Sequence, residues 1–255
     1  MGITIAIVNQ KGGVGKTTTA INLGTALAES GKMVLLIDTD PQVNATSGVG
    51  VDVEKLEASL YDLYTQGKDI LQVLYPTSIE NLHLLPGSSD LSGIEVELLH
   101  EAGRETRLKN ILTAVQDAYD FILIDCPPSL GLLTVNALVA AQRVIVPVQC
   151  EYYALEGLSR LMKTLDLVKK EINPALDVEG ILLTMHDART KLSGEVVKET
   201  RKFFGDRVYH TQISRDVRIS EAPSYGQPIS VYARRSKGAD AYNKLAKELI
   251  AHVHQ

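Results

Sequence analysis

The sequence has no tryptophan, three phenylalanines and two cysteines in 255 residues. Two cysteines cannot supply a disulfide framework, which excludes a small secreted fold held together by disulfides. No uninterrupted apolar segment approaches the roughly 18–20 residues that cross a bilayer. The first residues, MGITIAIVNQKGG, lack the basic start and the small-residue cleavage site of a secretory signal. These absences predict a cytoplasmic protein.

The composition is that of a folded, globular protein. Hydrophobic residues make up 45% of the chain and charged residues 22%, a balance that excludes a disordered chain or a collagen-like fibre. The length suits one large domain or two small ones, and no repeat or Pro/Gly/Ser-rich linker divides it. We therefore expect a single domain over residues 1–255. Because the first strand is expected to begin at residue 3, we expect no N-terminal helix-turn-helix domain.

The charges are unevenly distributed along the chain. The net charge of −5 argues against a wholly basic nucleic-acid-binding protein. Residues 189–237, however, contain 11 Lys or Arg and 5 Asp or Glu, an excess of +6, so the rest of the chain carries −11. A basic region on an acidic protein is a candidate surface for a polyanion.

Short apolar runs alternate with helical patterns throughout the chain. The apolar runs are hydrophobic at every position, as in strands of a parallel sheet that is buried on both faces. Strands are expected at 3–8, 33–37, 121–124, 144–148 and 178–184, and 82–88 is strand-like. Helices are expected at 17–31, 103–117, 131–141, 154–172, 191–204 and 235–254. This alternation predicts an α/β fold, doubly wound, with a mostly parallel sheet and helices on both faces.

A phosphate-binding loop is the strongest functional signal. Residues 9–18 read NQKGGVGKTT, where Gly15, Lys16 and Thr17 match the end of the G-x-x-x-x-G-K-[ST] pattern. Gln10 stands where that pattern has its first glycine, and Gly12 and Gly13 follow it. Glycines let backbone N–H groups surround a phosphate, and the next helix adds its positive N-terminal end. We expect Lys16 to neutralise phosphate oxygens and the Thr17 hydroxyl to bind Mg²⁺.

Three aspartates end two of the expected strands. Asp38 and Asp40 follow the run MVLLI, and alternation along an extended chain puts both on one side. Asp125 ends the run FILI, as a carboxylate that binds Mg²⁺ through water would. Ligands of α/β folds bind at the carboxyl ends of strands. The three carboxylates therefore predict a Mg²⁺ site and a group that orients an attacking water, which are the parts of a weak ATPase.

The variant loop resembles that of the deviant Walker A ATPases, which include ParA, MinD, the arsenite-pump ATPases and nitrogenase iron protein. In that family a lysine at the position of Lys11 crosses a dimer interface to the partner's nucleotide. The resemblance extends over essentially the whole chain to the chromosomal ParA proteins, also called Soj. It rests on LLIDTDPQVNATSG, FILIDCPPSLGLLT, VPVQCEYYALEGL, GILLTMHDART and VRISEAPSYGQPI.

The resemblance to ParA and Soj implies a cycle. ATP binding makes a homodimer that binds double-stranded DNA without sequence preference and associates with the nucleoid. Slow, Mg²⁺-dependent hydrolysis to ADP, stimulated by a ParB-type centromere-binding partner, then separates the subunits. The gene's product would thereby segregate a chromosome or a plasmid.

The resemblance also assigns residues. Lys11, Lys16 and Asp40 would be catalytic, Asp40 by positioning the water, and Thr17, Asp38 and Asp125 would serve Mg²⁺. The triphosphate would be held by Lys11, Gly12, Gly13, Val14, Gly15, Lys16, Thr17 and Thr18. Glu151 would lie near the partner's nucleotide, and the adenine would face Met185, Ile213, Ser214, Asp216 and Val217. The family commonly has proline at the position of Ser214, and proline packs against a base in a way that serine cannot.

DNA contacts are expected from the basic region. The residues are Arg189, Arg215, Arg218, Arg234, Arg235 and Lys237, of which the first three match family positions linked to DNA. No aromatic interleaving or reading helix indicates base recognition, so we expect binding that is blind to sequence. With about three phosphate contacts per subunit and about six per dimer, binding would depend steeply on salt.

Three other interpretations of the sequence remain open. A MinD-type membrane protein would carry a C-terminal amphipathic helix rich in lysine and aromatic residues. AYNKLAKELIAHVHQ has an apolar stripe but two lysines and no Phe or Trp, so we expect it to pack on the domain without stable membrane association. An iron–sulfur reductase would need paired cysteines, and Cys126 and Cys150 lack ligand spacing. A related ATPase that positions a protein cargo is the other alternative.

Overall fold

Eight strands form one sheet in the order β3-β4-β2-β5-β1-β6-β7-β8 in the computed structural model, which describes residues 2–151 and 154–253. All neighbouring strands of this sheet run parallel except the pair β3 and β4. The strands are β1 Ile3–Ile7, β2 Val34–Asp38, β3 Tyr75–Pro76, β4 Leu82–Leu85, β5 Phe121–Asp125, β6 Arg143–Gln149, β7 Asp177–His186 and β8 Val208–Ser214. The arrangement confirms the predicted, mostly parallel sheet.

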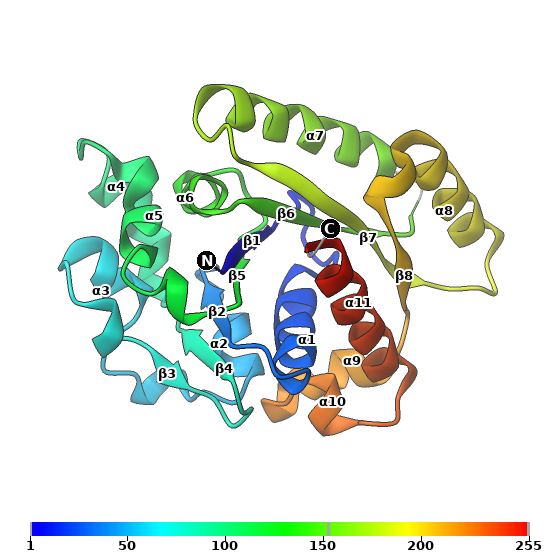
Figure 1. Ribbon diagram of the computed structural model, residues 1–255, viewed down its shortest axis with the longest axis horizontal. Coiled ribbons are helices and arrows are strands. Elements are labelled where there is room, and N and C mark those ends of the chain that lie inside the picture. Colours follow the sequence, from blue (N-terminus) through cyan, green and yellow to red (C-terminus); the bar gives the residue numbers. More distant parts are fainter. Residues whose placement is uncertain (1, 152–153, 254–255) are drawn as a thin grey trace.

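Helices cover both faces of the sheet (Figure 1). Successive residues of a strand point to opposite faces, so Ile5 and Ile7 pack in one hydrophobic core and Ala6 and Val8 in the other. The first core includes α1 and α11, and the second includes α5, α6 and α7. The helices are α1 Lys16–Glu29, α2 Asn44–Gly48, α3 Leu60–Thr65, α4 Ile94–Glu97, α5 Arg107–Leu112, α6 Leu132–Ala140, α7 Ala154–Glu171, α8 Lys191–Phe204, α9 Val217–Glu221, α10 Ile229–Tyr232 and α11 Lys237–Val253.

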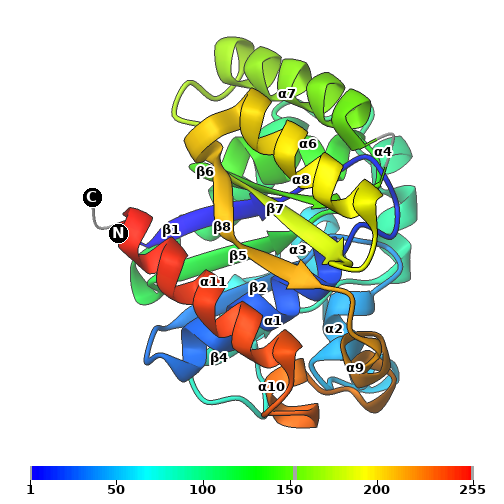
Figure 2. The same ribbon diagram turned by 90° about the vertical axis from the view of Figure 1, so that its right-hand side faces the viewer.

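The apolar stripe of α11 faces the domain, as predicted. Tyr242, Leu245 and Leu249 are buried where the helix packs against α1 and β8 (Figure 2). The predicted helix extended to residue 254, which lies outside the described residues. None of the described helices combines the length and the apolar character that crossing a membrane requires.

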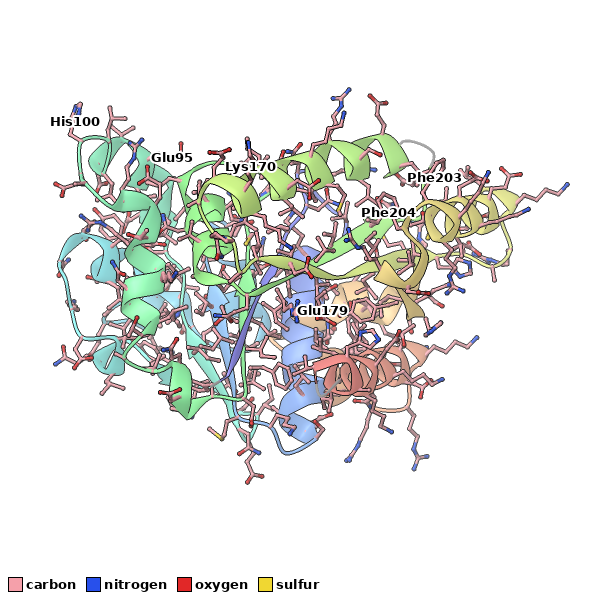
Figure 3. All side chains as sticks on the ribbon, turned by 45° about the horizontal axis from the view of Figure 1, so that its top comes forward. Glu95, His100, Lys170, Glu179, Phe203 and Phe204 are labelled. Atoms are coloured by element: carbon pink, nitrogen blue, oxygen red, sulfur yellow. The ribbon has the colours of Figure 1, made fainter. Side chains whose placement is uncertain are left out.

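Several parts of the fold differ from the prediction, among them the short helices α9 and α10, which were not predicted. The helix expected at 103–117 is limited to α5, with short 3-10 turns on either side. Strand β8 was not predicted, because VYHTQIS has no continuous apolar run; the strand lies at the edge of the sheet and mixes buried with exposed residues. Glu248 of α11 accepts hydrogen bonds from the backbone N–H groups of His210 and Thr211 on β8, at 2.6 and 3.0 Å. Glu179 of β7, which is labelled in Figure 3, contacts His252 of α11, with 3.1 Å between Oε1 and Nδ1.

The sheet topology brings three loops together. Strand β1 lies between β5 and β6, and the register pairs Ile7 with Asp125 and Asp38 with Asp125. The loops that follow β1, β2 and β5 therefore leave the same edge of the sheet next to one another. In doubly wound folds, ligands bind outside this edge, where the strand order reverses.

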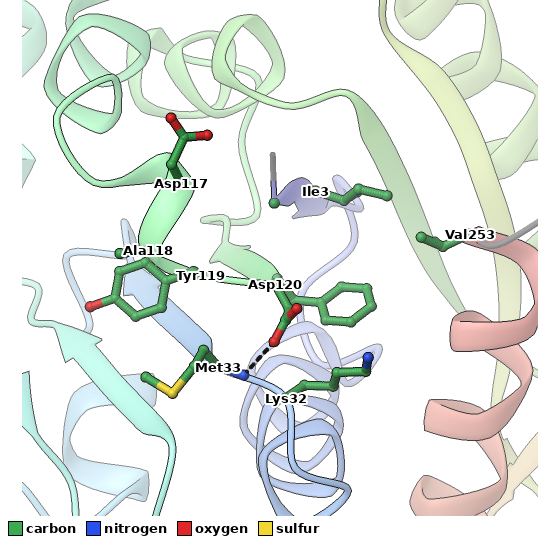
Figure 4. Close-up of a pocket in the computed structure, with 10 residues that line it drawn as sticks. Ile3, Lys32, Met33, Asp117, Ala118, Tyr119, Asp120 and Val253 are labelled. Atoms are coloured by element: carbon green, nitrogen blue, oxygen red, sulfur yellow. Dashed lines mark hydrogen bonds between the residues drawn. The ribbon is translucent and has the colours of Figure 1, made fainter.

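The opposite edge, where the strands begin, has a hollow of about 500 Å³ (Figure 4). Asp120 is one of its lining residues and accepts a hydrogen bond from the backbone N–H of Met33 at 2.8 Å. This bond ties the start of β5 to the start of β2. The carboxylate thus has a structural role at the end of the sheet far from the phosphate-binding loop.

Candidate functional site

The loop between β1 and α1 is shaped by glycines in left-handed conformations. Gly13 and Gly15 have φ of 73° and 91°, a region that residues with side chains rarely adopt. Gly15 immediately precedes α1, so the N–H groups at the start of this helix face the loop. No described atom lies within 4 Å of the position that a Cβ would take at Gly12 or Gly13. The loop therefore has the open space and the backbone donors that a phosphate needs.

Neighbouring strands brace this loop. The hydroxyl of Thr184, near the end of β7, donates to the carbonyl of Val14 at 2.8 Å. Asn9 donates its side-chain N–H to the carbonyl of Pro147 at 2.7 Å and accepts from the backbone N–H of Lys11 at 3.0 Å. Sequence reasoning missed Thr184 and Asn9, because both act through contacts more than 130 residues apart in the chain.

Lys16 points into the domain rather than into solvent. It is 6% exposed, and its Nζ lies 3.4 Å from the backbone carbonyl oxygen of Lys11. Burial lowers the pKa of the Lys16 ammonium, while the carboxylates of Asp125 and Asp40 oppose that change. The carboxylates of Asp125 and Asp40 therefore lie close enough to Lys16 to influence its charge.

Asp38 is fully buried and heavily hydrogen-bonded. Its Oδ2 accepts from the backbone N–H and the hydroxyl of Thr46, at 2.8 and 2.7 Å, and its Oδ1 accepts from the N–H of Asp40 at 3.2 Å. The Thr46 hydroxyl also accepts from the N–H of Gly87 at 3.1 Å. Burial raises the pKa of Asp38 to about 6 in spite of these bonds.

Asp125 is the buried carboxylate with the fewest partners. No described donor makes a hydrogen bond of ordinary geometry to either of its oxygens. The Thr17 hydroxyl is close enough to lower the pKa of Asp125, but burial and then the charge of Asp38 raise this pKa well above its usual range. An unpartnered buried charge is costly, and a divalent cation would offset that cost. The residues Thr17, Asp38 and Asp125 therefore fit a Mg²⁺ site.

These three residues would supply only part of the coordination of a Mg²⁺ ion. Among the described residues, no group of three or more His, Cys, Asp or Glu side chains could hold a metal ion by itself. Mg²⁺ usually keeps several waters and binds one or two carboxylates together with substrate phosphates. Asp40, which is also buried, accepts from the N–H of Gln42 at 3.0 Å, and its second oxygen is available to a water.

Lys11 and Glu151 lie at the outer side of the loop and contact each other. Lys11 Nζ is 2.6 Å from Glu151 Oε2, and both side chains are about half exposed. The other oxygen of Glu151 accepts from Gln149 Nε2 at 2.6 Å. The two residues that the family resemblance assigned to a partner's nucleotide are thus brought together within one chain.

The residues expected at the adenine occupy different environments. Met185, the next-to-last residue of β7, has φ of 51°, an uncommon conformation for a residue other than glycine. Ile213 is buried in the core of the α1 face, whereas Val217 is exposed. Asp216 pairs with Arg218, and Ser214 lines a surface hollow of about 440 Å³. Any contact that Ile213 makes with a base would therefore come through its backbone.

The basic residues divide between two places. Arg215, Arg218 and Lys237 line the 440 Å³ hollow together, and Arg189 follows the neighbouring strand β7. Arg234 lines a different hollow with Glu29, beside the C-terminal end of α1. Arg235 is exposed and follows Arg234 in the loop between α10 and α11.

Fold and site together define a P-loop ATPase. Residues 2–178 match the family described as AAA domain. The chain is 55% identical over 251 residues to the sporulation initiation inhibitor protein Soj of Bacillus subtilis, covering 98% of this chain and 99% of that one. Other relatives are described as chromosome-partitioning ATPase Soj or chromosome partitioning protein ParA. The chain belongs to the Soj/ParA family of chromosome-partitioning ATPases.

Solved structures agree with this family. A Mycobacterium smegmatis protein described as cobyrinic acid a,c-diamide synthase, with bound ADP and magnesium, has a TM-score of 0.88 and 38% identity over 100% of this chain and 96% of its own. The cell division ATPase MinD of Pyrococcus furiosus has a TM-score of 0.82 and 29% identity, covering 98% and 99% of the two chains. The bound nucleotide and magnesium of the first are consistent with the site described above.

Proposed function

We propose that this chain is an ATP-driven DNA segregation protein. ATP binding joins two copies into a dimer, the dimer binds duplex DNA without sequence preference, and slow hydrolysis stimulated by a ParB-type partner separates the copies. The observation that carries the proposal is Lys11, a second lysine of the phosphate-binding loop, which is half exposed whereas Lys16 of the same loop is buried. The names of the relatives, which describe chromosome partitioning, support it.

The chain's own residues suffice to position a triphosphate for attack by water. The backbone of Gly12 to Gly15 would surround the β-phosphate, Lys16 would neutralise phosphate oxygens, and Thr18 would lie at the α-phosphate. Mg²⁺, held by Thr17, Asp38 and Asp125, would supply charge neutralisation on the phosphate oxygens. Asp40 would accept a hydrogen bond from the attacking water and orient it. Hydrolysis of this kind needs positioning more than covalent chemistry.

Lys11 and Glu151 would act between the two copies. In the dimer, Lys11 would leave Glu151 and contact the phosphates bound by the other copy. Glu151 would then lie at the same interface, close to the partner's nucleotide. A base between the ends of β7 and β8 would be contacted by Met185, Ile213, Ser214, Asp216 and Val217.

Salt-dependent DNA binding would come from the basic region. About six phosphate contacts per dimer would give a steep dependence on salt and leave a single copy with very weak affinity. Dimerisation would thereby couple DNA binding to ATP. The contacts would come from Arg189, Arg215, Arg218, Arg234, Arg235 and Lys237.

Binding to random-sequence duplex DNA tests the proposal. The protein would be measured with ATP, with ADP and without nucleotide, each at low and moderate salt. We expect binding with ATP alone, weakened by salt and by Arg189→Ala. The matched control is Lys109→Ala, which removes the same charge from α5 on the far side of the domain and should leave binding unchanged. ATP binding without DNA binding would refute the DNA step and favour a cargo-positioning or membrane-associated ATPase.

A further inference from the structure

Two arginines of the basic region are held in the same way by an aspartate two residues earlier. Arg189 donates its backbone N–H and its Nε–H to Asp187 Oδ1, at 3.0 and 2.9 Å, and its Nη2–H to Oδ2 at 2.7 Å. Arg218 makes the same three hydrogen bonds to Asp216, at 3.1, 3.0 and 3.1 Å. We name these pairs the Asp187–Arg189 clamp and the Asp216–Arg218 clamp.

The two clamps occupy equivalent places on neighbouring strands. Strands β7 and β8 run parallel, with His186 opposite Ser214, and each clamp begins within two residues of its strand's end. The backbone N–H of Arg215 donates to the carbonyl of His186 at 3.0 Å, which ties the two loops together. Both clamps therefore lie at the same edge of the sheet.

Each clamp covers its carboxylate and exposes its guanidinium. The aspartate side chains are 20% and 10% exposed, whereas those of Arg189 and Arg218 are 88% and 48% exposed. Hydrogen bonds from Arg189 hold the pKa of Asp187 below its usual range, so this carboxylate stays ionised. A guanidinium has five N–H donors, and the carboxylate takes two of them. Three donors of each arginine remain for another acceptor.

We propose that Asp187 and Asp216 are positioning residues for DNA binding, which fix two guanidinium groups with their remaining donors toward the phosphates of a duplex. The inference rests on the DNA binding proposed above. A fork of donors that is already oriented loses less side-chain freedom when it binds a phosphate. Two such groups on one rigid edge would also define how the duplex lies on the protein, without reading its sequence.

Charge alone predicts the opposite result for loss of an aspartate. Replacing Asp187 or Asp216 by asparagine adds one positive charge to each copy, which would tighten binding to a polyanion. If the carboxylate positions its arginine, the same change weakens binding. Asparagine keeps an oxygen that can accept the backbone N–H at the turn, which preserves the local fold. It replaces the second carboxylate oxygen, which accepts the Nη2–H of the arginine, by an amide group that cannot accept it.

The experiment measures random-sequence duplex binding with ATP for the wild type and for the single variants Asp187→Asn and Asp216→Asn, with dimer formation recorded in the same samples. We expect affinity per dimer to fall about 10-fold, as for loss of charge-assisted hydrogen bonds. Glu195→Gln adds the same charge on α8 and should bind as tightly as the wild type or more tightly. In an Arg189→Ala background, Asp187→Asn should not weaken binding further, because there is no guanidinium to position and only the effect of the added charge remains.

The possible outcomes distinguish a failure of the positioning role from a failure of the proposed ATP-dependent DNA binding. A wild type that binds DNA, with asparagine variants that bind equally or more tightly, would overturn the positioning role and leave the proposed function in place. A further loss from Asp187→Asn in the Arg189→Ala background would assign the aspartate a structural role instead. A wild type without ATP-dependent DNA binding would overturn the proposed function, and this inference with it.

Discussion

Lys11 and Glu151 form an ion pair within one chain, with 2.6 Å between Nζ and Oε2. Both side chains are half exposed, so the pair contributes about 0–1 kcal/mol to stability. Its importance lies in what it does to Lys11. If Lys11 serves a nucleotide bound by a second copy, this ion pair must break when the dimer forms.

Glu151→Gln should therefore favour the dimer. The change releases Lys11 and removes a negative charge from the vicinity of the phosphates. We expect the dimer dissociation constant, measured by analytical ultracentrifugation with a slowly hydrolysed ATP analogue, to fall about 3-fold, in line with one exposed ion pair. Glu156→Gln, which breaks the exposed pair of Glu156 with Arg160 on α7, is the matched control and should not change it. A weaker dimer in Glu151→Gln would mean that the carboxylate itself makes an interface contact.

Asp40→Ala should separate ATP binding from hydrolysis. Asp40 is buried beside Lys16 and has an oxygen that can orient a water. Without it we expect ATP to bind and the dimer to persist, while turnover falls by about 10²-fold or more. Size-exclusion chromatography and phosphate release measure the two effects. Lys16→Ala is the contrasting variant, because it should abolish ATP-dependent dimerisation as well. Normal turnover in Asp40→Ala would assign the water to another residue.

Asp38 should make the nucleotide-free, metal-free protein less stable as the pH rises. Its pKa in the folded protein is about 6, against 3.8 ordinarily, because of burial. The folded state thus holds this proton more tightly than the unfolded chain, so stability from this group is present at low pH and is lost as the pH rises from about 4 through 6. The loss is on the order of 3 kcal/mol.

Urea unfolding between pH 4 and 7.5 tests that prediction. Asp38→Asn should lose less stability over this range than the wild type, because asparagine does not ionise. Asp117→Asn, a change at an exposed aspartate, should follow the wild type. Equal pH dependence in all three proteins would contradict the assignment of the shift to Asp38.

The sequence predicted the parts of the site that depend on local pattern. Gly13 and Gly15 could be identified because they belong to a glycine-rich phosphate-binding pattern, and Asp38 and Asp125 because each ends an apolar run. Thr184 could not, since its contact with the loop depends on which strands become neighbours.

The two aspartate–arginine clamps could not be predicted either, because they too depend on contacts that the sequence pattern does not show. Arg189 and Arg218 were identified as cations, but their charge pattern does not reveal the hydrogen bonds that they donate to Asp187 and Asp216. Strand β8 escaped prediction because an edge strand needs no continuous apolar run. Residues fixed by pairing between distant strands are thus the ones that the sequence alone left out.

At position 43, the protein should be more stable with glycine than with alanine. Val43 has φ of 57°, a conformation that costs a β-branched residue about 1–2 kcal/mol, and it precedes α2 in the loop that carries Asp40. Both variants remove the buried side chain, so their difference isolates the backbone. Glycine adopts positive φ without strain. We therefore expect the free energy of unfolding in urea to be about 1 kcal/mol higher for Val43→Gly than for Val43→Ala. Val49, also buried but with φ of −100°, is the control position. There Val49→Ala should be more stable than Val49→Gly. If the alanine variant were more stable than the glycine variant at both positions, the loop would have to relax out of the left-handed conformation once the side chain of Val43 is removed.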